Sequence, residues 1–158
     1  MLARIRLHNN GEGRNLPRVV DLLRFSEEDI RNRLRDLGYS YDSELLVTGF
    51  EDWEVEYNMS LTQAYMLKVV LVGYYDNDEF ILVHQLKRRI PIMDICLNHY
   101  KFLSRNEVEV MKHILKNCEM NSVIEFFFQS QNWVNAVSAY VESGYLLNTN
   151  NGFYYLDE

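Results

Sequence analysis

The C-terminal stretch Tyr145-Leu-Leu-Asn-Thr-Asn-Asn-Gly-Phe-Tyr-Tyr-Leu156 predicts a β-hairpin, which together with the helices before it indicates the fold class. Two β-rich runs, residues 145–148 and 153–156, flank a turn that contains Asn151-Gly152, a dipeptide typical of tight hairpin turns. Apolar residues at helical spacing predict three helices before the hairpin, over residues 104–117, 122–128 and 132–143, the last ending at Gly144.

Three helices followed by a hairpin resemble a winged helix-turn-helix, in which the third helix enters the DNA major groove and Arg and Lys contact bases and phosphates. Residues 117–158 contain no Lys or Arg, so the predicted third helix and the hairpin have no base to read DNA. If this part is winged-helix-like, we expect it to bind protein. The basic run Lys87-Arg88-Arg89 is interpreted as a helix end or solvated face, with nucleic-acid contact as the alternative.

The N-terminal half predicts a mixed sheet with helices. Ala3, Ile5 and Leu7 alternate with polar residues and predict a first strand, and residues 9–13 predict a turn or loop. Further elements are a second strand or short helix over 18–25, a helix capped by Ser26 and ended by Gly38, a strand over 45–49 that could continue to Tyr57, and a helix over 61–72 capped by Ser60. Residues 80–86 fit either a strand or a helix.

These elements predict the α+β class. We expect an acidic α+β portion over residues 1–80, then a mainly helical portion over residues 81–158 that ends in the hairpin. The 158 residues are enough for one domain or two small ones, with a core that needs no disulfide or metal.

Charge is distributed unevenly along the chain. The net charge is −7, but residues 36–80 contain ten acidic residues and one basic residue, Lys68, and sum to −9; the other 113 residues sum to +2. If Asp52, Glu54 and Glu56 lie on a strand, they share one face at roughly 6.8 Å intervals, comparable to the spacing of phosphates along a nucleic-acid strand.

We therefore predict that this acidic stretch mimics DNA phosphates and competes for the positive groove of a DNA-binding protein, without binding DNA itself. The alternative is a solvated face that keeps the protein soluble. The nine predicted phosphate stand-ins are Asp42, Glu44, Glu51, Asp52, Glu54, Glu56, Asp76, Asp78 and Glu79. Four aromatic residues beside them are candidate interface anchors or core residues: Trp53, Tyr57, Tyr74 and Tyr75.

Signatures of catalysis are missing from the sequence. It has no G-x-S-x-G, P-loop, H-E-x-x-H or dinucleotide-binding glycine motif, so we expect neither an enzyme nor a cofactor. One weak zinc candidate combines two thiols and two imidazoles: Cys96, His99, His113 and Cys118. Because the last two straddle a predicted helix end, we expect no metal site and interpret the cysteines as small buried thiols.

The start of the chain has no apolar signal region, and the longest apolar run, residues 69–75, is far shorter than the roughly 20 residues of a membrane span. Two cysteines are too few for a disulfide framework. We expect a protein of the cytoplasm.

Several segments together resemble the ArdA antirestriction family of mobile elements. They are the loop at residues 9–13, Phe25-Ser-Glu-Glu-Asp-Ile30 leading to Leu37-Gly38, Thr48-Gly-Phe-Glu-Asp52, Tyr140-Val-Glu-Ser-Gly144 and Asn148-Thr-Asn-Asn-Gly-Phe153. The resemblance covers about half of the chain. It implies an acidic, non-catalytic, DNA-mimicking inhibitor that acts in a bacterial host cell, occupies type I restriction-modification enzymes and commonly forms dimers.

The sequence departs from that family in its second half, where residues 81–158 contain eight acidic and seven basic residues. A family member usually remains acidic throughout. We therefore keep two targets open for the predicted inhibitor, a restriction enzyme or a CRISPR nuclease complex, the second being the target of an anti-CRISPR protein from a phage or other mobile element. The alternative function is a winged-helix-like protein-interaction or regulatory module.

Overall fold

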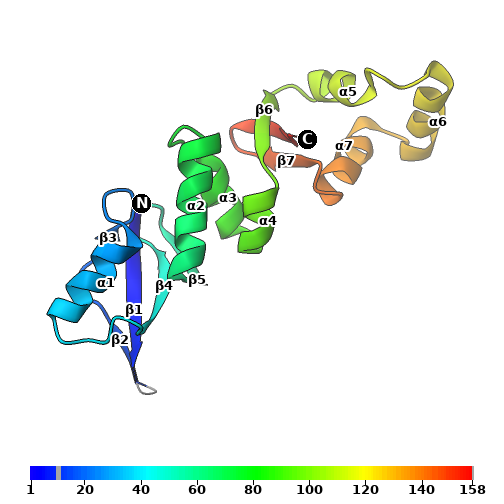
Figure 1. The fold of residues 1–158 in the computed structure, drawn as a ribbon. Coiled ribbons are helices and arrows are strands. Elements are labelled where there is room, and N and C mark those ends of the chain that lie inside the picture. Colours follow the sequence, from blue (N-terminus) through cyan, green and yellow to red (C-terminus); the bar gives the residue numbers. More distant parts are fainter. Residues whose placement is uncertain (10–11, 158) are drawn as a thin grey trace. The chain divides into compact units, whose positions relative to one another are not determined.

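The computed structural model describes residues 1–9 and 12–157 and divides into two compact units, Met1–Leu97 and Asn98–Glu158 (Figure 1). Its helices and antiparallel sheets, with a C-terminal hairpin, confirm the α+β class. The division lies after Leu97 rather than after residue 80, because α3 (Phe80–Lys87) and α4 (Ile92–Leu97) bury their apolar side chains in the core of the first unit.

The first unit is built on a five-stranded sheet whose pairings are all antiparallel, so its strand directions are not mixed. On one edge, β1 (Leu2–Asn9) pairs with β2 (Glu12–Asn15) and β3 (Val20–Asp21). On its other edge β1 pairs with β4 (Glu44–Phe50), which in turn pairs with β5 (Val55–Ser60).

One face of this sheet is apolar and the other is polar, as the alternation in β1 predicts. Ala3, Ile5 and Leu7 are buried in a core that also contains the buried sides of α1 (Glu27–Asp36) and α2 (Leu61–Tyr74). Arg4, Arg6 and His8 alternate with them and are less buried. The polar face therefore leaves charged side chains accessible to a ligand or partner.

Both long helices of this unit begin at the predicted caps. The Ser26 hydroxyl accepts from the Asp29 amide at 3.1 Å while the Asp29 carboxylate accepts from the Ser26 amide at 2.8 Å, and Ser60 and Gln63 repeat this capping box at α2. The hydrogen bond from the Ser26 side chain, then the one from its backbone, lowers the pKa of Asp29.

The second unit contains β6 (Tyr100–Ser104), α5 (Glu107–Leu115), α6 (Met120–Ser130), α7 (Trp133–Glu142), β7 (Leu146–Thr149) and β8 (Gly152–Leu156). Its sheet has the order β6-β8-β7, so the hairpin pairs with the strand that precedes the helices. The core joins α5, α7 and the hairpin through Val110, Met111, Val137, Leu146 and Phe153.

Several sequence expectations were wrong locally. The loop expected at residues 9–13 is strand β2 at Glu12 and Gly13, while Asn10 and Gly11 lie outside the described residues. Of residues 18–25, only Val20–Asp21 form a strand. Residues 80–86, for which a strand and a helix were both left open, form a helix, and neither α4 nor β6 was predicted. Helix α5 begins at Glu107, because Asn106 is its cap. None of the described helices is long and apolar enough to cross a membrane.

Candidate interaction surface

The nine predicted phosphate stand-ins all belong to the first unit, and all are exposed. They lie in or beside three connections. The α1–β4 connection and the start of β4 carry Asp42 and Glu44; the β4–β5 turn and the start of β5 carry Glu51, Asp52, Glu54 and Glu56; the α2–α3 connection carries Asp76, Asp78 and Glu79. Charge of one sign is thus concentrated on loops rather than along a helix.

The expectation that Asp52, Glu54 and Glu56 share one face of a strand is wrong. β4 ends at Phe50 and β5 begins at Val55, so only Glu56 of the three lies on a strand. The intervening residues form a tight turn in which the Glu54 amide donates to the Glu51 carbonyl at 3.2 Å and Glu54 has a positive φ of 51°. The turn breaks the alternation on which the 6.8 Å spacing depended.

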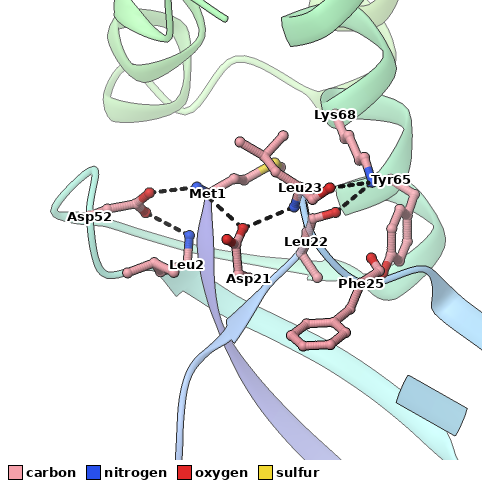
Figure 2. Close-up of polar contacts among 9 residues, drawn as sticks. All are labelled: Met1, Leu2, Asp21, Leu22, Leu23, Phe25, Asp52, Tyr65 and Lys68. Carbon is pink, nitrogen blue, oxygen red and sulfur yellow. Dashed lines mark hydrogen bonds and ion pairs between the residues drawn. The ribbon is translucent and has the colours of Figure 1, made fainter. Parts of the chain in front are cut away.

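Asp52 is bound to the N-terminal end of β1 (Figure 2). Its Oδ1 accepts a hydrogen bond from the Leu2 amide at 2.8 Å, and its Oδ2 lies 2.7 Å from the amino group of Met1. The neighbouring Asp21 carboxylate lies 3.9 Å from the same amino group and accepts from the Leu23 amide at 3.0 Å. Asp52 therefore joins the β4–β5 turn to β1 and is no longer a candidate phosphate stand-in.

Lys68, the one basic residue in the acidic stretch, does not pair with the acidic residues of that stretch. Figure 2 shows its ammonium against the segment that follows β3, where it donates to the Leu22 carbonyl at 2.6 Å and the Leu23 carbonyl at 3.4 Å. Tyr65, one helical turn earlier, donates to the Phe25 carbonyl at 2.8 Å. Both side chains therefore bind this segment to α2 through hydrogen bonds. Lys68 neutralises none of the nine carboxylates.

Eight stand-ins are left once Asp52 is set aside. Glu56 lies 3.8 Å from Arg4, with a side chain that is 84% exposed, so this pair is weak. Among the described residues the other seven make no ion pair. Their negative charge is therefore available to a partner.

The four aromatic candidates differ in how far their side chains are buried. Trp53 is only 6% exposed and its ring lies 4.6 Å from that of Phe50, so of its two predicted roles, interface anchor or core residue, the structure has the second. Tyr57 is half-buried and donates to the Ile90 carbonyl at 3.1 Å, and Tyr75 packs against the core. Tyr74 alone of the four is well exposed, so it is the remaining anchor candidate beside Asp76.

The weak zinc candidate gains no support. Among the described residues no three His, Cys, Asp or Glu side chains form a group that could hold a metal. The His113 ring lies 4.7 Å from that of Tyr155 at a tilt of 49°, and Cys118 is exposed, contrary to the expectation that it is buried. Cys96 is partly buried in α4, and this burial raises its thiol pKa.

The second unit presents few free cations. Lys101 lies 2.7 Å from Asp157, a contact that raises the Lys101 pKa, and Lys112 lies 2.9 Å from Glu109. The Arg105 guanidinium donates to the Asn151 carbonyl at 3.0 Å. Three of the four basic residues of this unit are thus engaged within it, which agrees with the absence of bases from α7 and the hairpin.

Helix α6 of the second unit has no buried residue. Met120, Ile124 and Phe128 are exposed, Phe128 to 86%, and their spacing of four places them along one side of the helix. This apolar stripe was not predicted, although the i, i+4, i+8 pattern is visible in the sequence.

Comparison with known proteins does not identify the chain: no family model, no curated protein and no solved structure matches it. The resemblance to the ArdA family therefore stays a prediction.

Sequence reasoning also missed the joint position of Arg4 and Arg89. They line a polar hollow of about 270 Å³ on the outer face of the sheet. The alternation in β1 placed Arg4 on the polar face, but nothing in the sequence indicated that the end of α3 would return to it.

Proposed function

We propose that the chain inhibits a bacterial host-defence nuclease by presenting the acidic connections of its first unit to the nuclease's positively charged DNA groove. The observation that carries this proposal is the set of seven exposed carboxylates without an ion pair among the described residues. They are Asp42, Glu44, Glu51, Glu54, Asp76, Asp78 and Glu79.

Carboxylates without an ion pair favour association in two ways. Their field attracts a basic surface over about 8 Å at physiological ionic strength, which accelerates encounter. No intramolecular ion pair has to break before each carboxylate meets an Arg or Lys of the groove, so less of the interaction energy is lost.

The imitation of DNA is local. The first unit contains sixteen acidic and twelve basic residues, a net charge of −4, and the second contains seven and four, a net charge of −3. Three acidic connections match a few phosphates at the entrance of a groove rather than a long duplex. A restriction enzyme and a CRISPR nuclease both have such a groove, and both remain targets of the proposal.

The test is a DNA-cleavage assay with a type I restriction enzyme and with a CRISPR effector, comparing the natural chain with the variant E51K/E54K/D76K/E79K. These four residues are chosen because their carboxylates accept no hydrogen bond within the described structure, whereas Asp78 accepts from the Phe80 amide at 3.0 Å. The proposal expects inhibition by the natural chain and its loss in the variant.

A matched control reverses four exposed acids outside the acidic stretch: Glu28, Glu107, Glu119 and Glu125. It changes the net charge equally, so it should keep inhibition if position matters. Equal loss in both variants would show a response to total charge, and full inhibition by the first variant would exclude the acidic connections.

The second candidate function is a protein-interaction module in the second unit, favoured by the stripe of Met120, Ile124 and Phe128 on α6. It expects that I124S/F128S abolishes partner binding while E51K/E54K/D76K/E79K retains it. The two variants therefore distinguish the two functions in one pull-down experiment from bacterial lysate.

A further inference from the structure

Two arginines from distant parts of the sequence meet at β5, on the outer face of the first unit's sheet. The Arg4 guanidinium donates to the Val55 carbonyl at 3.3 Å and lies 3.8 Å from the Glu56 carboxylate. The Arg89 guanidinium donates to the Glu56 carbonyl. Two positive groups thus converge on a single stretch of strand.

Arg4 reaches β5 by crossing β4 at a glycine. Arg4 pairs with Gly49, and Gly49 pairs with Glu56, so β4 lies between the two. A Cβ atom at position 49 would collide with the Val55 carbonyl and would lie 2.7 Å from the Arg4 guanidinium. Glycine at this position therefore makes the room in which the guanidinium lies.

Arg89 occupies a backbone conformation that usually selects glycine. Helix α3 ends in a Schellman motif, in which the Ile90 amide donates to the backbone carbonyl of Gln85 at 3.1 Å and the Arg89 amide donates to that of Leu86 at 3.0 Å. Arg89 has a φ of 61°.

Helix α1 ends in the same motif, and there the equivalent residue is Gly38, with a φ of 90°. The same chain thus uses glycine where only the turn matters and arginine where the side chain reaches β5. Side chains held at a strained backbone position are a recognised feature of functional sites.

The two guanidiniums line a hollow of about 270 Å³, which we call the arginine hollow. Its lining residues all bear polar groups: Arg4, Thr48, Glu56, Tyr57, Asn58 and Arg89. The Arg89 guanidinium lies 5.8 Å from the centre of the Tyr57 ring, and the Tyr57 hydroxyl donates to the Ile90 carbonyl, so this lining residue is held in place.

We propose that the arginine hollow binds the phosphate group of a small phosphate-bearing molecule. A single guanidinium satisfies a planar carboxylate with two parallel hydrogen bonds, whereas a tetrahedral phosphate has enough oxygens for two guanidiniums at different angles. The Asn58 amide supplies a further donor at the same hollow, whereas the Thr48 hydroxyl already donates to the Arg4 carbonyl at 3.3 Å.

A second hollow, of about 560 Å³, adjoins the first and shares Arg4 and Thr48 with it. It adds Arg18 and Glu51 together with the apolar residues Leu16, Pro17 and Val19. The organic part of the ligand fits this mixed lining, so a phosphate monoester binds more tightly than inorganic phosphate.

The Glu56 carboxylate competes with the phosphate of the ligand for the Arg4 guanidinium. Its carboxylate faces Arg4, and its largely exposed side chain is free to swing into water when a phosphate takes its place. Replacing it by glutamine should therefore increase phosphate affinity. The inference does not rest on the proposed inhibition of a nuclease, since the guanidiniums of Arg4 and Arg89 hold the phosphate, although Glu51, one of the seven carboxylates, lines the second hollow.

The experiment titrates the full chain with inorganic phosphate, phenyl phosphate and AMP at constant ionic strength, following the arginine side-chain resonances by NMR and the heat by calorimetry. We expect saturable binding with a Kd of about 1 mM for phosphate and tighter binding of the two esters. Arg89→Gly should weaken binding at least about tenfold, because one guanidinium is lost.

Arg89→Gly suits the test because glycine fits the Schellman position, so loss of binding is not loss of the fold; a thermal unfolding curve checks this. Arg88→Gln is the matched charge control, since Arg88 is exposed and does not line the hollow, and it should bind as the natural chain does. Glu56→Gln should bind more tightly.

Three results would overturn the inference. They are no saturable shift with any of the three ligands, equal affinity in the natural chain and Arg89→Gly, and acetate binding as tightly as phosphate. Equal affinity for phosphate and both esters would remove the second hollow from the site. Tighter binding of a single-stranded oligonucleotide than of AMP would assign the hollow to nucleic acid instead.

Discussion

The carboxylate of Asp52 accepts a hydrogen bond from the backbone amide of Leu2 at 2.8 Å, which joins the β4–β5 turn to the first residues of β1. This bond separates Asp52 from the other acids of its stretch. An acid that satisfies a backbone amide contributes to stability, whereas an acid without a partner contributes charge for an interaction.

We predict that Asp52→Ala lowers the free energy of unfolding by about 1–2 kcal/mol, because it leaves the Leu2 amide without its charged acceptor. Glu51→Ala should change it by less than about 0.5 kcal/mol, since the Glu51 side chain is exposed. Urea unfolding of the two variants makes the comparison. Equal destabilisation by both would contradict the structural role of Asp52.

The two Schellman motifs of the first unit give a second prediction. Gly38→Ala should destabilise the protein by about 1 kcal/mol, because alanine at a φ of 90° is strained and nothing nearby compensates. Arg89→Gly should leave stability within about 1 kcal/mol, as relief of strain offsets the lost contacts of the guanidinium. Thermal unfolding measures both, and strong destabilisation by Arg89→Gly would show that Arg89 has a structural role.

Local signals in the sequence were sufficient for the class and for the long helices. The capping boxes at Ser26 and Ser60 and the hairpin turn over residues 149–152 each act over four residues or fewer, and the structure has all three. The two turn residues are Asn150 and Asn151, whereas Gly152, expected in the turn, begins β8. Periodicity of apolar residues likewise located α5, α6 and α7 to within a few residues.

Non-local pairing accounts for most of what was missed. Strand β2 has no apolar side chain inside the sheet and exists because β1 offers its edge, so Glu12 to Asn15 resemble a loop in sequence. Residues 52–57 alternate between acidic residues and aromatic or apolar ones like a strand, but a positive φ at Glu54 turns the chain there. The sequence predicted that the acidic side chains of the site are exposed. It did not predict the roles of Asp52 and Trp53, because these depend on contacts with residues distant in the sequence.

His84 gives a prediction for pH dependence. Its Nε2 is buried without a hydrogen-bond partner among the described residues, and burial, with the nearby Arg88, lowers its pKa from the ordinary value of about 6.5. Between the folded and unfolded pKa values the unfolded chain binds more protons, so stability falls as the pH drops below about 6.5.

The variant His84→Gln should remove this contribution and flatten the decrease of stability below pH 6.5. Chemical unfolding at a series of pH values compares the two chains. The same slope in both would show that His84 titrates alike in the folded and unfolded states.

The two cysteines should differ in reactivity. Cys118 is exposed, whereas Cys96 is partly buried and burial raises its pKa, so less of it is thiolate at neutral pH. A chromogenic disulfide reagent should label Cys118 at least about tenfold faster than Cys96 in the folded protein. Mass spectrometry of the labelled peptides identifies the site, and comparable rates would mean that α4 opens readily.

Competition for DNA tests the central proposal most directly. A labelled duplex is bound to the nuclease, and the natural chain or E51K/E54K/D76K/E79K is added while fluorescence anisotropy reports displacement. We predict that the natural chain displaces the duplex less well as salt increases, and that the variant has roughly 100-fold lower affinity for the nuclease. Equal displacement by both chains, independent of salt, would contradict an acidic surface that occupies the DNA groove.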